Sequence, residues 1–127
     1  MWYREARWKA RSLLEQALMR ERFPQFILTR AAAGAPLVWR GVLEPVAGSR
    51  FEVTATVPTN YPYAPPTLHV VKPRLRPDAP HVYYGSLDLC VHKDNWQPMR
   101  GTVASVIPLA SAWLVAYLNW ERTGEGF

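Results

Sequence analysis

Hydrophobic and polar residues follow two different periods along this chain. Between residue 2 and about residue 22 the hydrophobic residues recur every three or four positions, which is the period of a helix that buries one side. Pro24 ends this pattern. Trp8 and Met19 fall on the opposite side, which we expect to face solvent. The side expected to be buried consists of Ala6, Ala10, Leu13, Leu14, Ala17 and Leu18.

From Phe26 onward the period becomes that of strands. In the third segment apolar residues alternate with polar ones from Phe51 to Val57, as in a strand with one buried face. Short turns such as the one at 46–49 join successive strands, so an antiparallel meander is expected. The four predicted strands cover residues 26–30, 37–46, 51–57 and 67–71.

A second stripe with helical spacing predicts a C-terminal helix that extends to about Trp120. With Ser105 as its N-cap, Pro108 would fall in the first turn, where its missing N–H costs nothing. The element order predicts one α+β domain over residues 1–127: an N-terminal helix, a four-stranded antiparallel meander, an ordered loop and a C-terminal helix. The C-terminal stripe consists of Val103, Val106, Ile107, Ala110, Trp113, Leu114, Tyr117 and Leu118.

Prolines crowd the region between Pro58 and Pro80, and each of them fixes φ and removes an N–H donor. This predicts an ordered loop, in which the Tyr61–Pro62 bond is a candidate for the cis form. The chain has 127 residues, of which 49% are hydrophobic, enough to build a core. No apolar run reaches about 18 residues, and the charged start lacks the core of a signal peptide. We therefore expect a cytoplasmic protein that has no membrane partner.

The net charge of +5 is concentrated near the start, where seven basic residues fall within the first thirty. A basic end suits nucleic acid or an acidic protein partner, and it is equally typical of a solvated helix face. No RNP-like motif, zinc-finger spacing or glycine-rich phosphate loop is present. We therefore expect no nucleic-acid partner.

The candidate chemistry lies in the segment 81–98, which reads HVYYGSLDLCVHKDNWQP and contains Cys90, the only cysteine. A thiolate is a strong nucleophile and a good leaving group, whereas a lone cysteine between two aliphatic residues also suits a buried position. The absence of a CxxC pair argues against zinc. A cysteine protease would need a well-placed histidine base, and His92 is only two residues away. No metal and no cofactor are expected.

The order of these motifs resembles the ubiquitin-conjugating enzyme family. A strand is followed by Tyr-Pro-x-x-Pro-Pro, then by a histidine, a glycine, Leu-Cys and Trp-x-Pro before an amphipathic helix. The short loop after the cysteine and the ending LNWERTGEGF are similar to the bacterial branch, many members of which are associated with antiphage defence. The matching residues are Tyr61, Pro62, Pro65, Pro66, His81, Gly85, Leu89, Cys90, Val91, Trp96 and Pro98.

The resemblance implies a transferase in which Cys90 accepts a ubiquitin-like modifier from an activating enzyme as a thioester and passes it to an amine of a target protein. The position of the family's asparagine aligns here with Tyr83, so Tyr83, His92 or Asn95 is left as the candidate hydrogen-bond donor. The alternative is a binding or scaffold module for a ubiquitin-like protein.

Several further residues enter as supporting candidates. Asp88, His92 and Asp94 are close enough in sequence to act as a base for the incoming amine. His81 taken alone is more typical of a structural hydrogen-bonding residue. As the family places the contact with the activating enzyme on the N-terminal helix, the expected docking residues are Arg4, Arg7, Trp8 and Arg11.

Overall fold

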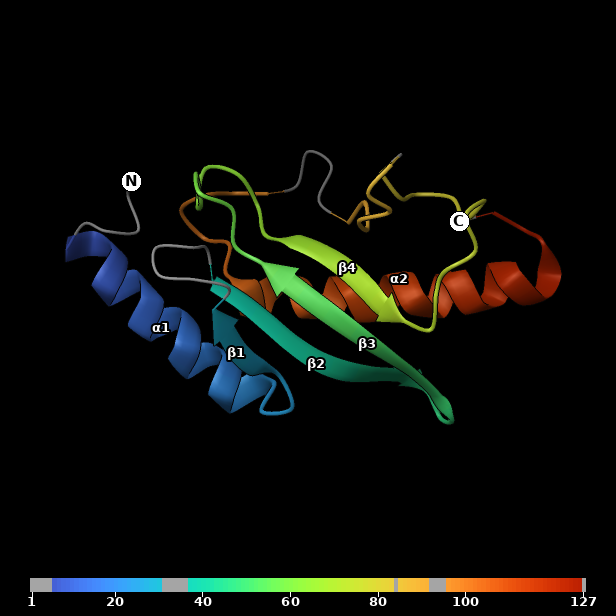
Figure 1. Ribbon diagram of the computed structural model, residues 1–127, viewed down its shortest axis with the longest axis horizontal. Helices are drawn as coiled ribbons and strands as arrows, with labels where there is room; N and C mark the ends of the chain where they lie inside the picture. The colour runs from blue at the N-terminus through green and yellow to red at the C-terminus, as the bar shows by residue number, and fades with distance from the viewer. Residues whose placement is uncertain (1–5, 31–36, 84, 92–95, 127) are drawn as a thin grey trace.

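Two helices and one sheet make up the computed structural model, which describes residues 6–30, 37–83, 85–91 and 96–126 (Figure 1). The order of elements confirms the predicted α+β architecture. In chain order the elements are α1 (Ala6–Arg22), β1 (Ile27–Arg30), β2 (Leu37–Val46), β3 (Ser49–Thr56), β4 (Thr67–Lys72) and α2 (Val103–Thr123).

The sheet is an antiparallel meander with strand order β1-β2-β3-β4, as the short predicted turns require. β2 and β3 form a long hairpin in which Leu43 pairs with Phe51 and Val46 pairs with Ser49. Gly48 has a φ of 87° in the connecting turn, a conformation that glycine adopts without steric cost. β1 and β4 therefore form the two edges of the sheet.

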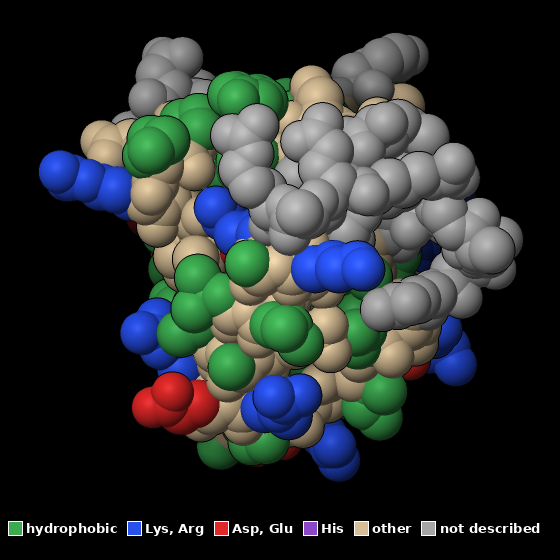
Figure 2. All heavy atoms as spheres, turned by 90° about the vertical axis from the view of Figure 1, so that its left-hand side faces the viewer, with side chains coloured by type: hydrophobic (Ala, Val, Ile, Leu, Met, Phe, Trp, Pro, Cys, Tyr) green, Lys and Arg blue, Asp and Glu red, His purple; other side chains and the backbone are tan. Residues whose placement is uncertain are grey.

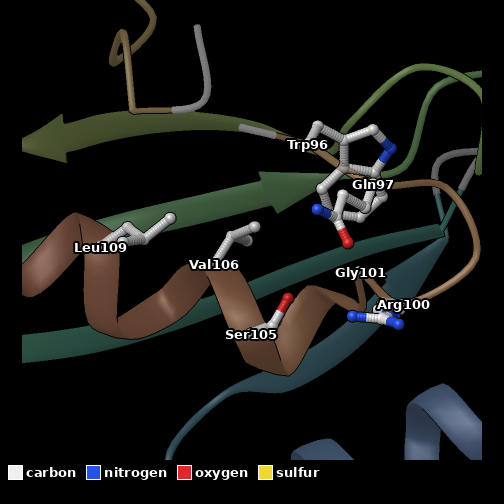
Figure 3. Close-up of a pocket in the computed structure, with 7 residues that line it drawn as sticks. All are labelled: Trp96, Gln97, Arg100, Gly101, Ser105, Val106 and Leu109. Carbon is white, nitrogen blue, oxygen red and sulfur yellow. The ribbon is translucent and has the colours of Figure 1, made fainter. Parts of the chain in front are cut away.

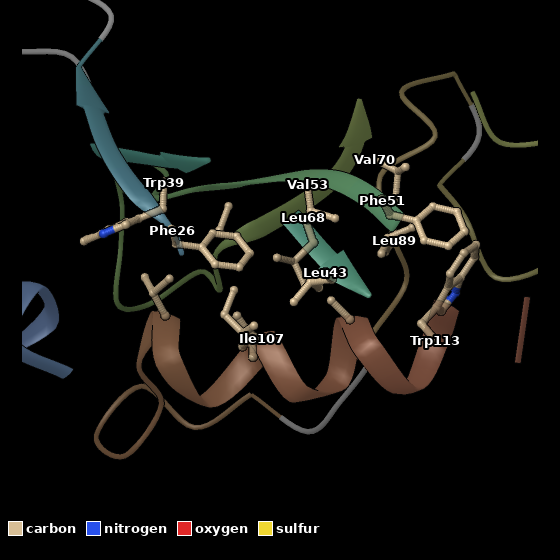
Figure 4. Packing of buried hydrophobic residues seen from close by; sticks show 14 of the residues in the cluster. Phe26, Trp39, Leu43, Phe51, Val53, Leu68, Val70, Leu89, Ile107 and Trp113 are labelled. Carbon is tan, nitrogen blue, oxygen red and sulfur yellow. The ribbon is translucent and has the colours of Figure 1, made fainter. Parts of the chain in front are cut away.

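The core lies between the sheet and α2 (Figure 4). Alternation along β3 buries Phe51, Val53 and Ala55, while the intervening polar residues are only partly covered. The predicted stripe of α2 packs against this face, and all of its members except the half-buried Leu118 are buried. The strand segments and α2 therefore bury the faces that their sequence periods predicted.

The start of α2 differs from the prediction. Thr102, not Ser105, is the N-cap, and the helix begins at Val103. The Thr102 side chain accepts a hydrogen bond from the Ser105 N–H (3.1 Å), and the Ser105 side chain accepts one from the Thr102 N–H (2.9 Å). In this capping box each residue satisfies a donor of the other. Pro108 consequently lies inside the helix, on its exposed side.

The prediction for α1 was wrong about which side is buried. Leu13 and Leu14 are 67% and 51% exposed, whereas Met19, expected to face solvent, is only 1% exposed. Ser12 and Glu15 are also buried on the inward side. The cause is a set of polar contacts, described below, that hold Glu15 against the start of α2 and that a hydrophobic period cannot reveal.

By length and composition alone, α2 is able to cross a membrane. Of its most apolar 18-residue window, 44% is buried inside the domain, where Ile107 and Leu114 lie in the core. A core helix of a folded domain passes the same test. The sequence prediction that no apolar run is long enough did not anticipate it.

Candidate functional site

Cys90 lies at the end of a short irregular hairpin that follows the proline-rich loop. Val82 pairs with Leu89 in an antiparallel bridge. On either side of this pair, the Tyr83 N–H donates to the Asp88 carbonyl (2.8 Å), and the Cys90 N–H donates to the His81 carbonyl (2.9 Å). Two backbone hydrogen bonds therefore fix the position of the cysteine.

Successive side chains of this hairpin point alternately toward the core and toward an outer side. Leu89 is 2% exposed and Val82 packs against the core. Residues two apart in a strand project to the same face, so Asp88 and Cys90 project away from the core. Tyr83 lies opposite Asp88 and belongs to the same outer side, where it is 49% exposed. Cys90 itself is half-buried and is a free thiol.

Three hydrogen bonds hold the hairpin against the scaffold. The Leu89 N–H donates to the Leu68 carbonyl of β4 (2.8 Å), and Nδ1 of His69 lies 3.1 Å from Oδ1 of Asp88. Trp113 of α2 donates from Nε1 to the His81 carbonyl (3.0 Å), the same oxygen that accepts from Cys90. Both neighbouring elements, β4 and α2, thus hold the segment around Cys90 in place.

Sequence reasoning missed two of these contributions. Trp113 was expected to be a packing residue, and its ring is buried, but its indole N–H also fixes the backbone opposite Cys90. His69 was not among the candidates at all. Its only signal was a polar residue between buried neighbours Leu68 and Val70 on β4. A contact with Asp88, 19 residues away, is not visible in such a pattern.

Tyr83 is the supporting candidate that the structure brings to the cysteine. A side-chain hydrogen bond with Cys90 raises the pKa of Tyr83 above its ordinary value, and partial burial and the nearby charges of Cys90 and Asp88 act in the same direction. The phenol therefore stays protonated and is able to donate a hydrogen bond across the neutral pH range.

The remaining candidates divide into two groups. The His81 side chain is exposed, and its backbone, at a φ of 58°, provides the carbonyl that accepts from Cys90 and Trp113. His92, Asp94 and Asn95 lie outside the described residues. Within the described part of the chain, no three His, Cys, Asp or Glu side chains come together in a way that could hold a metal ion.

The Tyr-Pro-x-x-Pro-Pro turn contacts the loop that follows the cysteine. Its Tyr61–Pro62 bond is cis, as the sequence suggested, and Lys72–Pro73 is also cis. Tyr61 and Pro66 are buried, and Pro65 is half-buried. Trp96, after the cysteine, donates from Nε1 to the Pro62 carbonyl (2.6 Å), and its ring lies 5.9 Å from that of Tyr61. Pro98 is half-buried in the same loop.

A buried carboxylate joins this turn to both helices. Oε1 of Glu15 accepts hydrogen bonds from the Tyr61 hydroxyl (2.6 Å) and from Nε of Arg11 (3.0 Å), while Oε2 accepts from the Val103 N–H (2.9 Å). Arg11 also donates to the Tyr61 hydroxyl and the Gly101 carbonyl. Because Val103 is the first residue of α2, the carboxylate meets the positive end of the helix dipole.

This arrangement bears on the predicted docking residues. Arg11 points inward to Glu15 and Tyr61, so its guanidinium belongs to the fold. Arg4 lies outside the described residues, as do the side chains of Arg7 and Trp8. The outward side of α1 instead presents Leu13 and Leu14. On the face of the molecule that carries α1, hydrophobic side chains are interspersed with Lys and Arg (Figure 2).

A shallow pocket of about 180 Å³ lies between the loop of Trp96 and the start of α2 (Figure 3). It does not include Cys90 or the rest of the hairpin, so it is separate from the thiol. Its described lining residues are Trp96, Gln97, Arg100, Gly101, Ser105, Val106 and Leu109.

Comparisons with known proteins agree with this picture. Residues 15–126 match the family described as Type II CBASS E2 protein. The chain is 30% identical over 94 residues to Ubiquitin-conjugating enzyme E2 6 of Candida glabrata; the match covers 66% of the chain and 36% of that relative's length. The structure of human Ubiquitin-conjugating enzyme E2 G1 superposes on this chain with a TM-score of 0.56 and 19% sequence identity. The superposition covers 82% of this chain and 93% of that one. At this identity the similarity shows a shared fold only.

Proposed function

The chain belongs to the Type II CBASS E2 protein family, a bacterial ubiquitin-conjugating-enzyme-like family linked to antiphage defence, and from that premise we propose that Cys90 is a thioester carrier. In this proposal Cys90 accepts a ubiquitin-like modifier from an activating enzyme and passes it to an amine of a target protein. The single observation that carries the proposal is the position of Cys90: half-buried, free, and fixed by backbone hydrogen bonds on a hairpin bound to the core.

The chemistry needs two acyl transfers at one sulfur atom. In the first, the Cys90 thiolate attacks the carbonyl carbon of the modifier thioester on the activating enzyme; the new S–C bond forms and the activating enzyme leaves as its own thiolate. In the second, an amine nitrogen attacks the same carbon, the C–N bond forms, and the C–S bond breaks with its electron pair returning to Cys90. The amine proton passes to solvent or to a base.

Both steps require a sulfur that is accessible and held in one place. Half-burial leaves one side of Cys90 open to large partners, and the buried anchor of Leu89 prevents the cysteine from moving away. The matched relative is longer than this chain, so the activity of that whole protein is carried over here only as part of the proposal. We also propose a cytoplasmic location without a membrane partner, as the sequence composition led us to expect.

A docking surface for the activating enzyme belongs to the same proposal. We assign it to the outward side of α1, where Leu13 and Leu14 are exposed beside Lys9 and Arg20. Arg11 is excluded from this surface because it is bound inside the fold. Replacing Leu13 and Leu14 with Ser should weaken charging at limiting activating enzyme and should lower the free energy of unfolding by no more than about 1 kcal/mol. An unchanged dependence on the concentration of the activating enzyme would refute this assignment.

The proposal is tested by a charging assay with ATP, the activating enzyme and the modifier, followed by gels with and without reducing agent. We expect a shift the size of the modifier that reducing agent removes. Cys90→Ala should abolish the shift, and Cys90→Ser should give a weaker product that reducing agent does not remove, because an oxygen ester replaces the thioester. The exposed Thr59, which lies outside the hairpin, provides a control as Thr59→Ala.

The same experiment separates the carrier from the scaffold alternative. If the modifier binds but no reducible product forms with the complete set of partners, the chain is a binding module and Cys90 is not its functional centre. If Cys90→Ala loses the reducible product but still binds the modifier, binding and transfer are separate properties, as the carrier proposal requires.

A further inference from the structure

The outer side of the Cys90 hairpin carries Tyr83, whose hydroxyl group the two acyl transfers do not yet use. Tyr83 is opposite Asp88 in the hairpin, and Cys90 follows Asp88 by two residues on the same side. Diagonal neighbours of this kind in an antiparallel pair lie about 7–8 Å apart at Cα, a gap that an aromatic side chain is able to bridge. The register therefore places the Tyr83 ring within reach of the cysteine.

Two features keep this register from slipping. Val82 and Leu89 form the pair between the Tyr83–Asp88 and Cys90–His81 backbone hydrogen bonds. The side chains of this pair lie on the core side, where Leu89 is 2% exposed. A shift of one residue would bring Asp88 or Cys90 into the core and move Leu89 into water. In addition, the Leu87 N–H donates to the Tyr83 carbonyl (2.9 Å), which closes the hairpin end next to Tyr83.

We propose that the Tyr83 hydroxyl is a catalytic hydrogen-bond donor to the sulfur of Cys90, stabilising the thiolate that leaves when the amine attacks. This inference rests on the proposed carrier function and adds a residue to it. The negative charge on sulfur is largest as the C–S bond breaks, so a donor at this atom favours the transition state over the intact thioester. Tyr83 keeps its proton throughout, and the electron pair of the broken bond remains on sulfur.

The surroundings suit a neutral donor. The Cys90 contact, partial burial and the charge of Asp88 all raise the pKa of Tyr83, so the phenol does not ionise at neutral pH. Asp88 is itself engaged by another group, since its Oδ1 lies 3.1 Å from Nδ1 of His69. A hydrogen bond from a neutral donor to a charged sulfur is stronger than one between two neutral groups.

The test begins with the isolated protein, without any partner. The rate of alkylation of Cys90 by iodoacetamide is measured at pH 7 for the wild type and for Tyr83→Phe, which removes only the hydroxyl. If Tyr83 donates to the sulfur and stabilises the thiolate, the variant is alkylated about fivefold more slowly. Tyr63→Phe, which removes a hydroxyl from a tyrosine that is 76% exposed, should leave the rate unchanged.

The second readout is the rate at which charged protein transfers the modifier to free lysine. Tyr83→Phe should be charged to the same extent as the wild type and should transfer the modifier about tenfold more slowly. This loss of rate is smaller than that expected on removing a fully enclosed donor, because Tyr83 is half exposed. Unchanged unfolding midpoints in urea for both variants would exclude a structural effect. An unchanged alkylation rate in Tyr83→Phe overturns the role of Tyr83 whatever the charging gel shows. A slower alkylation supports it even if no modifier is ever transferred, so the two proposals fail separately.

Discussion

The indole N–H of Trp96 donates a 2.6 Å hydrogen bond to the carbonyl oxygen of Pro62, 34 residues earlier in the chain. This contact ties the loop that follows Cys90 to the turn that precedes the fourth strand. Gly101 lies directly beneath the Trp96 ring, and a Cβ built on it would overlap three ring atoms. The position of the Trp96 loop therefore depends on the absence of a side chain at residue 101.

Gly101→Ala should destabilise the domain for this reason. The clash is with a rigid ring that is also held by Pro62, and overpacking of this kind costs about 1–3 kcal/mol. The measurement is the urea unfolding midpoint. Gly126→Ala is the matched control because nothing lies within 4 Å of a Cβ built there. Its unfolding midpoint should equal that of the wild type within experimental error. Equal midpoints for the two variants would contradict the packing described.

Glu15→Gln should destabilise the domain. The amide keeps the size of the side chain but loses the charge that holds Arg11 and the N–H of Val103. Because Arg11 is 21% exposed and partly screened, we expect a loss of about 2 kcal/mol in the free energy of unfolding. Glu21→Gln on the exposed side of the same helix should change it by less than about 0.5 kcal/mol.

The faces of the strands and of α2 were predictable because burial there follows the local period of the chain. β3 buries Phe51, Val53 and Ala55 in strict alternation, and no distant residue is needed to decide which side faces the core. The same reasoning failed on α1. Glu15 meets Tyr61 and Val103, which are 46 and 88 residues away, and these polar contacts outweigh the exposure of two leucines.

The candidate site was predictable only in part, for a similar reason. The order of motifs singled out Cys90 and the Tyr-Pro-x-x-Pro-Pro turn, and Tyr83 was one of three open choices for a donor. The hairpin register that brings Tyr83 to Cys90 depends on the Val82–Leu89 pair, and Trp113 reaches the His81 carbonyl from another element. Such positioning depends on tertiary contacts and leaves no periodic signal in the sequence.

Matched substitutions on the two sides of α1 test its orientation directly. Met19→Ala removes a side chain that is 1% exposed and should lower the free energy of unfolding by about 2–5 kcal/mol. Leu14→Ala removes a side chain of similar size that is 51% exposed and should change it by about 0.5 kcal/mol or less. Chemical denaturation of both variants gives the comparison. If Leu14→Ala were the more damaging change, α1 would be packed as the hydrophobic stripe first suggested.

The last prediction concerns stability at alkaline pH. Burial, followed by the charge and hydrogen bond of Glu15, raises the pKa of Tyr61 far above its ordinary value, and Arg11 only partly opposes this. The unfolded chain releases the Tyr61 proton near pH 10, whereas the folded protein retains it. The stability that this group contributes is therefore fully present below about pH 10 and decreases as the pH rises beyond that value.

Tyr61→Phe removes the ionisable group and should therefore flatten this alkaline decline. The variant should be less stable than the wild type at pH 7, because it loses the hydrogen bond to Glu15, and the difference should narrow above about pH 10. Urea unfolding from pH 7 to 11 measures both slopes. Tyr63→Phe, at an exposed tyrosine, should leave the slope unchanged. A constant gap between the wild type and Tyr61→Phe across this range would show that Tyr61 titrates alike in the folded and unfolded chain, and that its hydroxyl is not held by the buried carboxylate.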